Sequence, residues 1–417
     1  MAAEVAITGI GWVTSIGCDG ETVRQSLLQG RSGIRSVDWY PDCPVKVAGT
    51  IPEFEVSSPN WIKWKFPSTF KIRRDALRSL APHGVYAICS VLQALQDADL
   101  EEEALSTPDT GLFCASAGSP FMIHHYLKEM DRTGGKRGQP MGIVSSICGT
   151  LNFNLGAYFK IKGANLGMVS ACASSSHALG YAMEEIRSGR QRRMVVVGSE
   201  EVNPEGVVPF AAMRALSLSH STEASRPFDQ NRDGFVGSGG AVCLIVESVD
   251  VAKQRGAEIK ALLSGWGQAS DGHNVAISHE QGDGLGRAME NALKDARIGV
   301  GQVGYINAHA TSTLVGDRSE AIAIGRVFAD NPQVPVSSTK ALTGHTLSMS
   351  GALEAGICCM ALREGLAFPQ AHLQSVDSAC EHLNLPTTAS RLSAPYVLSN
   401  SSGFGGSNVT LILRRPE

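Results

Sequence analysis

Short apolar runs that are typical of β-strands alternate with segments of helical periodicity along this chain. Strand-like runs cover residues 5–11, 110–118 and 193–201, and helical patterns cover residues 83–100 and 177–189. Strands that are separated by helices form mostly parallel sheets, and the helices cover the faces of those sheets. The alternation therefore predicts an α/β protein.

The second half of the chain repeats the plan of the first. Residues 257–270 form a β-rich run that resembles residues 4–15, and both runs contain glycines beside a tryptophan. A helical segment, a strand with a loop and a closing pair of strands follow the second run. We therefore predict two similar halves, an N-terminal half of residues 1–255 and a C-terminal half of residues 256–417.

Charged residues make up only 18% of the 417 residues, and the formal net charge is −4. Soluble domains contain about 25% charged residues, so the composition excludes a disordered chain or one that coats nucleic acid. Residues 138–159 and 163–183 contain no Asp, Glu, Lys or Arg. Both stretches are too rich in polar residues for a membrane-spanning helix, and we expect them to be buried in protein. The N-terminus has no basic leader, so we expect a cytoplasmic protein without a membrane segment.

The ten cysteines are scattered, without a CxxC pair or a Cys/His spacing of the zinc type. We therefore expect no metal, and we expect most of these thiols to be small buried side chains. Cys172 differs because it lies between an apolar strand and a helix that begins near Ser175. The positive end of a helix lowers the pKa of a nearby thiol and favours the reactive thiolate. On its position alone, Cys172 is equally well interpreted as a buried structural cysteine.

Two histidines at predicted strand ends favour the catalytic interpretation of Cys172. His309 lies where a strand runs into a Thr-Ser-Thr loop, and His345 lies in a second loop of small residues. Open α/β folds bind ligands at this edge of the sheet. A lone histidine is more often a satisfied core or surface residue, but three such loops with one reactive group each are not expected by chance. The glycine-rich turn 399–408 would bring backbone N–H groups close to a developing oxyanion.

Five segments carry a resemblance to a known family, in the order in which the family has them. They are VSACASSSHALG, RPFDQNRDGFVGSGG, NAHATSTLVGD, SSTKALTGHTLSMSGALEAG and SNSSGFGGSN. In these segments the chain resembles the elongating β-ketoacyl-[acyl-carrier-protein] synthases, the condensing enzymes of fatty-acid and polyketide synthesis. The resemblance implies a thiolase-type fold, with two similar α/β halves in five layers, αβαβα. It also implies that no cofactor is needed, because substrates arrive on the phosphopantetheine arm of acyl carrier protein.

The resemblance also assigns roles to the reactive residues. Cys172 would be the nucleophile that accepts the acyl chain as a thioester. His309 and His345 would hold the malonyl thioester carbonyl and stabilise the enolate that forms when carbon dioxide leaves. Lys340 and Glu354 match the family's supporting polar pair.

Further positions match parts of the family's substrate site. Thr311 and Thr313 match residues near the pantetheine arm, and Ser402 and Phe404 lie in the turn that would contact substrate. The backbone N–H groups of Cys172 and Phe404 would form the oxyanion hole.

The resemblance implies a dimer as well, and the two uncharged stretches would then line the core, the acyl pocket and the dimer interface. We expect an obligate dimer with its active sites beside that interface, and a homodimer is the expected form. A heterodimer with a chain-length factor or a second ketosynthase stays open.

A run of basic residues offers a docking site for acidic carrier proteins. Residues 61–78 contain only one acid, in a chain whose net charge is negative. A local excess of positive charge steers an acidic partner to the surface that carries it. The alternative is an ordinary solvated helix face. The residues proposed for docking are Lys63, Lys65, Lys71, Arg73 and Arg74.

Several positions depart from the family pattern. Residues 237–240 read Gly-Ser-Gly-Gly where the family has Gly-Glu-Gly-Ala-Gly, and Ala310 stands where a glycine follows the histidine. Ser402 replaces a phenylalanine, and residues 346–350 replace smaller, more apolar ones. We therefore expect a specialised synthase, for a polyene or another secondary metabolite. The rival interpretation is a chain-length factor, a non-catalytic partner of another ketosynthase, but such partners lose the cysteine that is present here as Cys172.

Overall fold

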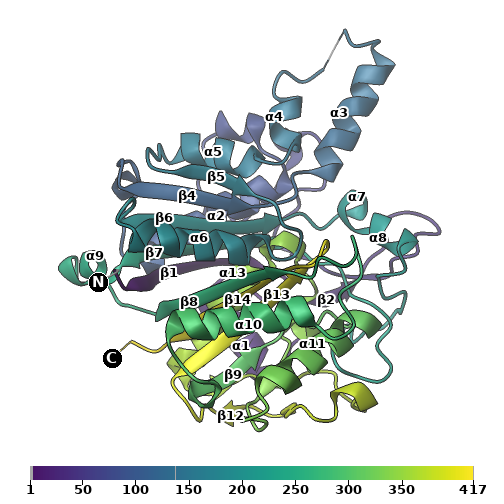
Figure 1. Ribbon diagram of the computed structural model, residues 1–417. Helices are drawn as coiled ribbons and strands as arrows, with labels where there is room; N and C mark the ends of the chain where they lie inside the picture. The colour runs from purple at the N-terminus through teal and green to yellow at the C-terminus, as the bar shows by residue number, and fades with distance from the viewer. Residues whose placement is uncertain (1–2, 137, 417) are drawn as a thin grey trace.

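In a computed structural model of the protein, which describes residues 3–136 and 138–416, ten strands form one continuous hydrogen-bonded sheet (Figure 1). Their order is β10-β9-β13-β14-β8-β1-β7-β6-β4-β5. The five strands of the N-terminal half lie together, and so do the five of the C-terminal half. The bounds are β1 Val5–Thr14, β4 Thr110–Ala115, β5 Asn165–Met168, β6 Arg193–Glu200, β7 Gly240–Ser248, β8 Ala261–Ser270, β9 Val303–Asn307, β10 Val336–Ser337, β13 Tyr396–Gly403 and β14 Ser407–Arg414.

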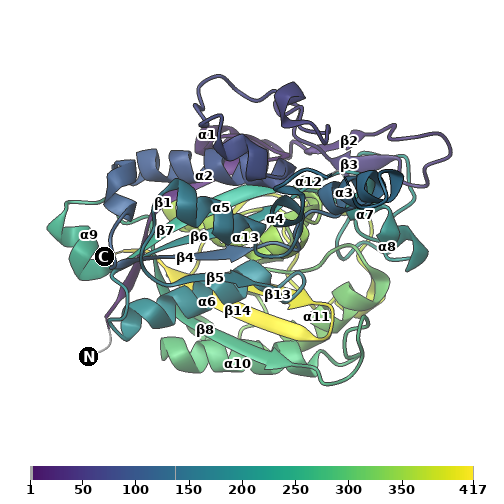
Figure 2. The same cartoon turned by 90° about the horizontal axis from the view of Figure 1, so that it is seen from above.

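The two five-stranded groups meet where β1 pairs with β8 over three residue pairs. Helices form three layers around them, and Figure 2 shows α2 and α10 on opposite sides of the molecule with α6 and α13 between them. The bounds are α1 Gly20–Gln29, α2 Pro82–Asp97, α3 Pro120–Arg132, α4 Gly142–Ser146, α5 Thr150–Tyr158, α6 Ser174–Arg187, α7 Pro204–Val207, α8 Pro209–Ala212, α9 Val249–Gln254, α10 Asp283–Ala296, α11 Leu314–Val327, α12 Lys340–Thr343 and α13 Ser350–Glu364.

Three large clusters of buried apolar side chains correspond to these layers. One joins α2 and α5 to the N-terminal strands, a second surrounds α6 and α13, and a third joins α10 and α11 to the C-terminal strands. Two pairs of short strands lie outside the sheet, β2 (Ile34–Ser36) with β3 (Val47–Gly49) and β11 (Leu366–Ala367) with β12 (Ser390–Arg391). The fold is therefore the predicted five-layered α/β arrangement.

The predicted strands and helices are confirmed, with ends that move by a few residues. The helical pattern at 83–100 is α2, the one at 177–189 is the greater part of α6, and the apolar runs at 110–118 and 193–201 are β4 and β6. The boundary between the halves at residue 255 stays a prediction. No helix in the described part of the chain is long and apolar enough to cross a membrane.

The two uncharged stretches, expected in the core, the acyl pocket and a dimer interface, are buried only in part within the single chain. Burial of the rest by a second subunit stays a prediction. Phe153 of α5 is 47% exposed, and at the sheet edge Leu166 and Val169 are 49% and 60% exposed. Strand β5 is the last strand of the sheet, so one of its edges is not paired within the sheet. In the single chain these stretches therefore form an apolar surface beside an open strand edge.

Candidate active site

Cys172 lies in a tight turn between β5 and α6. Ala171 before it adopts the left-handed backbone conformation, with φ of 49°, which is uncommon for a residue other than glycine. The Ser174 hydroxyl holds this turn, because it donates to the Ala171 carbonyl at 2.6 Å and accepts from the Ser170 N–H at 2.8 Å. The turn directs a buried thiol toward the C-terminal half.

Burial raises the pKa of the Cys172 thiol to about 12, although the positive charge of Lys340 acts in the opposite direction. The prediction of a lowered thiol pKa at the start of a helix is therefore wrong. Loss of hydration disfavours the thiolate more than the positive charge of Lys340 favours it. Cys172 therefore rests as a neutral thiol, which would need a neighbouring base to take its proton before it could act as a nucleophile.

His345 is placed to take that proton. It follows α12, and its Nε2 lies 3.0 Å from the Sγ of Cys172. Burial and the charge of Lys340 lower its pKa well below the usual value, so the ring is neutral at neutral pH. A neutral imidazole can accept a proton at one nitrogen.

His309 lies beside His345 at the end of β9. The two ring centres are 5.4 Å apart and the rings are nearly perpendicular. The carboxylate of Glu320 accepts hydrogen bonds from the N–H groups of His309 and Ala310 at 2.9 and 2.6 Å, which fixes the backbone at this point. Burial lowers the pKa of His309 well below the usual value as well, so the site contains two neutral imidazoles.

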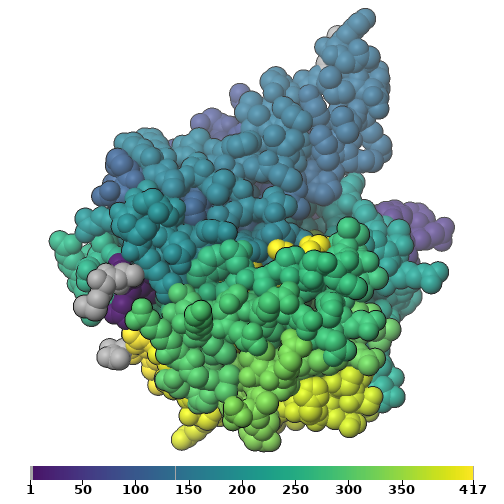
Figure 3. Space-filling model, in the orientation of Figure 1, coloured from purple at the N-terminus to yellow at the C-terminus, as the bar shows by residue number. Residues whose placement is uncertain are grey.

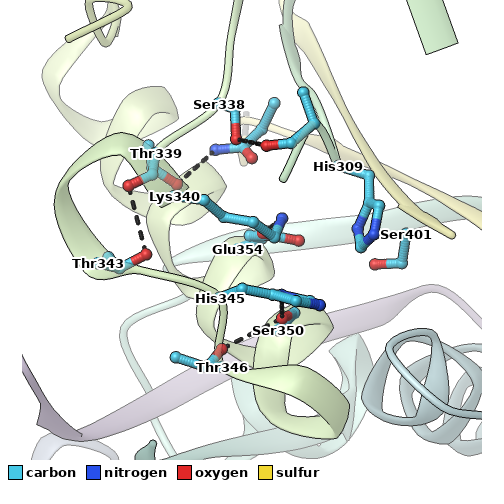
Figure 4. Close-up of polar contacts among 12 residues, drawn as sticks. His309, Ser338, Thr339, Lys340, Thr343, His345, Thr346, Ser350, Glu354 and Ser401 are labelled. Atoms are coloured by element: carbon cyan, nitrogen blue, oxygen red, sulfur yellow. Dashed lines mark hydrogen bonds and ion pairs between the residues drawn. The ribbon is translucent and has the colours of Figure 1, made fainter. Parts of the chain in front are cut away.

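Lys340 and Glu354 form a buried ion pair near both histidines (Figure 4). Each is about 1% exposed, and neither lines the cavity. Burial raises the pKa of Glu354, and the adjacent ammonium group counteracts part of that rise. The pair affects the site through the charge of Lys340, which favours the thiolate of Cys172 and the neutral forms of both histidines.

A cavity of about 540 Å³ brings most of the predicted site residues together. The side chains of Thr311 and Thr313 contact each other there, with 3.2 Å between their Oγ1 atoms. The Ser402 hydroxyl donates to the Asn408 side chain at 2.8 Å. The predicted residues that line the cavity are Cys172, His309, Thr311, Thr313, His345, Ser402 and Phe404.

The glycine-rich turn between β13 and β14 lies against the nucleophile. A Cβ atom on Gly403 would come within 2.5 Å of the Ser170 carbonyl oxygen and 3.1 Å of the Cys172 nitrogen, so only glycine allows this approach. The next residue is Phe404, which is 37% exposed. Figure 3 shows the yellow tip of this hairpin at the surface, between the blue and teal N-terminal half and the green C-terminal half. The pairing of the Cys172 and Phe404 N–H groups as an oxyanion hole stays a prediction.

Glu200 is a cavity residue that the sequence analysis did not single out. It ends β6, is 3% exposed, and accepts hydrogen bonds from the Ala117 N–H and the Ser348 hydroxyl. Burial raises its pKa to about 7. The sequence contained one signal for Glu200, the two acidic residues that end the apolar run at 193–201. A strand that ends in acidic residues places their carboxyl groups at the edge of the sheet.

The five basic residues proposed for docking are exposed, and none lines the cavity. The segment contains two single 3₁₀ turns, Trp61–Lys63 and Ala76–Ser79, so it is not the face of a regular helix. Lys65 pairs with Glu55 at 2.7 Å, and the Arg73 guanidinium lies 4.2 Å from the centre of the Tyr158 ring. The docking role stays a prediction. Within the described residues, no group of three or more His, Cys, Asp or Glu side chains could hold a metal ion.

Comparisons with known proteins agree with this geometry. A family model for the β-ketoacyl synthase N-terminal domain matches residues 2–252, and one for the C-terminal domain matches residues 260–374. The chain is 37% identical to 3-oxoacyl-[acyl-carrier-protein] synthase 1 of Haemophilus influenzae over 99% of both chains. It superimposes on a β-ketoacyl synthase from Burkholderia phymatum with a TM-score of 0.91, at 32% identity over the whole of both chains.

A third similar protein is a ketosynthase solved in complex with its type II polyketide synthase acyl-carrier protein. Its TM-score is 0.87 at 26% identity, and the whole of both chains is covered. A buried thiol, two neutral imidazoles and a five-layered α/β fold define a class of condensing enzymes, and the chain belongs to the β-ketoacyl synthase family. Within that family it is an acyltransferase of the 3-oxoacyl-[acyl-carrier-protein] synthase type.

Proposed function

We propose that Cys172, His309 and His345 carry out a decarboxylative condensation between an acyl thioester and a malonyl thioester. The observation that carries this proposal is the 3.0 Å contact between the Cys172 Sγ and the His345 Nε2, inside a cavity that also contains His309. A carbon–carbon bond of this kind requires a covalent acyl carrier and a stabilised carbanion. The cysteine supplies the first, and the two imidazoles supply the second.

In the acyl-transfer step, His345 takes the proton of the Cys172 thiol as the sulfur attacks the acyl thioester. The carbonyl carbon forms a bond to the Cys172 sulfur, and its bond to the carrier sulfur breaks. The proton passes from His345 to the departing carrier thiolate. Charge therefore does not accumulate in a site where burial disfavours it.

In the condensation step, the malonyl thioester loses carbon dioxide and becomes an enolate. Neutral His309 and His345 each donate one N–H to the enolate oxygen. The enolate carbon attacks the acyl carbonyl on Cys172, whose oxygen receives hydrogen bonds from the Cys172 and Phe404 N–H groups. The bond to the Cys172 sulfur then breaks, which releases a β-ketoacyl thioester. The Cys172 thiolate takes its proton from solvent, because His345 is already neutral at this point.

Acyl carrier protein is the expected donor of both thioesters. The solved complex of a related ketosynthase with its carrier protein supports this partner. The exposed basic residues Lys63, Lys65, Lys71, Arg73 and Arg74 supply positive charge for an acidic partner. Thr311 and Thr313, which line the cavity, are proposed to contact the pantetheine arm.

A second subunit is expected on the apolar surface beside β5. Exposed Leu166 and Val169 lie close in sequence to Cys172, so a partner there would cover the approach to the nucleophile. We infer a homodimer, and a heterodimer with a chain-length factor or second ketosynthase stays open. We infer a cytoplasmic location, because the reaction uses soluble carrier-bound thioesters.

The proposal is tested by incubating the protein with an acyl-[acyl-carrier-protein] thioester and measuring the intact mass. We expect one acyl adduct, which peptide mapping places on Cys172 and which is absent in Cys172→Ala. Cys148→Ala, which removes an exposed thiol, is the matched control and should keep the adduct. If no adduct forms and Cys172→Ala makes product at the wild-type rate, the proposed mechanism is wrong. Absence of product with any malonyl donor, from a protein that still pairs with an active ketosynthase, would support the chain-length-factor interpretation instead.

A further inference from the structure

Two hydroxyl groups lie close to His345 (Figure 4), at the ring nitrogen that does not face Cys172. The Ser350 Oγ lies 3.2 Å from the Nδ1 of His345, and the Thr346 Oγ1 lies 3.2 Å from the Ser350 Oγ. All three residues are at most 3% exposed. Both nitrogens of the His345 ring therefore have a partner within the protein, Cys172 at Nε2 and Ser350 at Nδ1.

Helix α13 places this hydroxyl together with the buried ion pair. Ser350 is the first residue of α13, and Glu354 follows four residues later on the same face. The first contacts His345 and the second contacts Lys340. A single helix therefore positions one group against the imidazole and another against the Lys340 ammonium group, which adds to the effect of burial in lowering the pKa of His345.

The partner at Nδ1 controls what Nε2 can do. A neutral imidazole has one N–H and one lone pair, so the group at Nδ1 determines whether Nε2 donates or accepts. A backbone N–H at Nδ1 could only donate, and a carbonyl could only accept. A hydroxyl can do either, and the Thr346 hydroxyl behind it can reverse its own direction to match.

We propose that Ser350 is a positioning residue that holds His345 through Nδ1 in both tautomers. This inference rests on the proposed function, because that mechanism gives Nε2 two opposite tasks. In acyl transfer, Nδ1–H donates to Ser350 and the Nε2 lone pair takes the Cys172 proton. In condensation, the Ser350 O–H donates to Nδ1 and Nε2–H donates to the malonyl carbonyl.

His309 offers an internal contrast. Its Nδ1 is buried without a hydrogen-bond partner among the described residues, although it lies in the same cavity. The structure therefore assigns the hydroxyl support to one imidazole and not to the other. A change at Ser350 should affect His345 and leave the ring of His309 as it is.

The kinetic test measures the two half-reactions separately in Ser350→Ala. We expect the rate of Cys172 acylation and the rate of malonyl decarboxylation each to fall about tenfold, as for the loss of one buried hydrogen bond. Ser350→Thr keeps the hydroxyl and should restore both rates. Ser90→Ala is the matched control, because Ser90 is a buried serine in α2 whose hydroxyl bonds only within its own helix. Wild-type rates in Ser350→Ala would overturn the inference.

A second measurement does not depend on activity. In protein labelled with ¹⁵N-histidine, the ¹⁵N shifts of each ring report its tautomer, and His345→Asn assigns the His345 signals. We expect Ser350→Ala to change the His345 shifts and to leave the His309 shifts unchanged. Unchanged His345 shifts would overturn the inference even if the rates fall, because the loss would then be structural. Failure of the proposed function would be recognised separately, by wild-type protein that forms no adduct on Cys172.

Discussion

The two sides of the cavity carry different titratable groups, and burial shifts their pKa values in opposite directions. On the side of the N-terminal half, Cys172 and Glu200 have raised pKa values, and the donors around Glu200 are an N–H and a hydroxyl. On the side of the C-terminal half, His309 and His345 have lowered pKa values and lie near the Lys340 ammonium group. Burial is the leading cause on both sides, and it neutralises acids and bases alike.

The two sides also differ in whether they contain a buried ion pair. On the nucleophile's side the donors to buried Glu200 are a neutral N–H and a neutral hydroxyl, whereas the histidine side holds a buried ion pair between Lys340 and Glu354. Cys172 therefore does not become reactive through its own half of the chain. In the proposed mechanism its base, His345, comes from the other half and lies in contact with it.

Removing the Cys172 thiol should have the largest effect, because it should abolish product formation and leave malonyl decarboxylation in place. In Cys172→Ala we expect β-ketoacyl product to fall by about 10⁴-fold or more, because no covalent acyl intermediate can form. Malonyl decarboxylation should persist, since both imidazoles remain. Gas-phase detection of carbon dioxide from labelled malonyl thioester, with product measured in parallel, checks this. Parallel loss of both activities would show that the two sides are not separable.

The reciprocal change removes one donor from the histidine side. In His309→Ala we expect decarboxylation to fall by about 10²- to 10³-fold, the usual cost of losing one hydrogen bond to an oxyanion. The acyl adduct on Cys172 should still form, because His345 contacts the thiol. Intact mass spectrometry of the adduct and a decarboxylation assay measure the two outcomes. A variant that decarboxylates normally would contradict the role of His309.

The third change removes the positive charge of Lys340, which lies on the histidine side of the cavity. Lys340→Met leaves Glu354 buried without its partner, so we expect the free energy of unfolding to fall by about 3–5 kcal/mol at neutral pH. Lys65→Met breaks an exposed pair with Glu55 and should change stability little. Urea unfolding followed by circular dichroism gives both values. Equal effects in the two variants would mean that burial does not matter here.

The smallest effect concerns the carboxyl on the nucleophile's side. The Glu200 pKa is raised from 4.5 to about 7, so the folded protein holds a proton that the unfolded chain releases between these values. The stability that this proton contributes is complete below pH 4.5 and is lost as the pH rises through about 7. Glu200→Gln should therefore gain, relative to wild type, on the order of 3 kcal/mol from pH 4 to pH 8. Unfolding curves at several pH values test this, and a constant difference would contradict it.

The sequence predicted the reactive residues better than it predicted their state. Cys172, His309 and His345 lie in one cavity as expected, because strand ends of an α/β fold converge at one edge. The direction of the thiol pKa was wrong, since a helix end is visible in a sequence and the extent of burial is not. Ser350 was recognised only as a departure from the family pattern, because its contact with His345 depends on how α13 packs.

Other features could not be predicted because they depend on what a side chain faces. Glu200 ends the apolar run at 193–201, and its carboxylate indicates a strand end without showing that the side chain faces the cavity. Residues 138–159 and 163–183 were expected to be buried because they lack charge, and Phe153 and Val169 within them are exposed in the single chain. Absence of charge predicts contact with protein, but it does not show whether that protein is the same chain.

The open edge of β5 has a consequence for how the protein must be assayed. The strand ends at Met168, four residues before Cys172, and the left-handed Ala171 lies between them. A neighbour that pairs with this edge would restrict the turn that aims the thiol. Specific activity would then depend on protein concentration, and turnover numbers measured at high dilution would describe a differently ordered nucleophile from the one present at cellular concentrations.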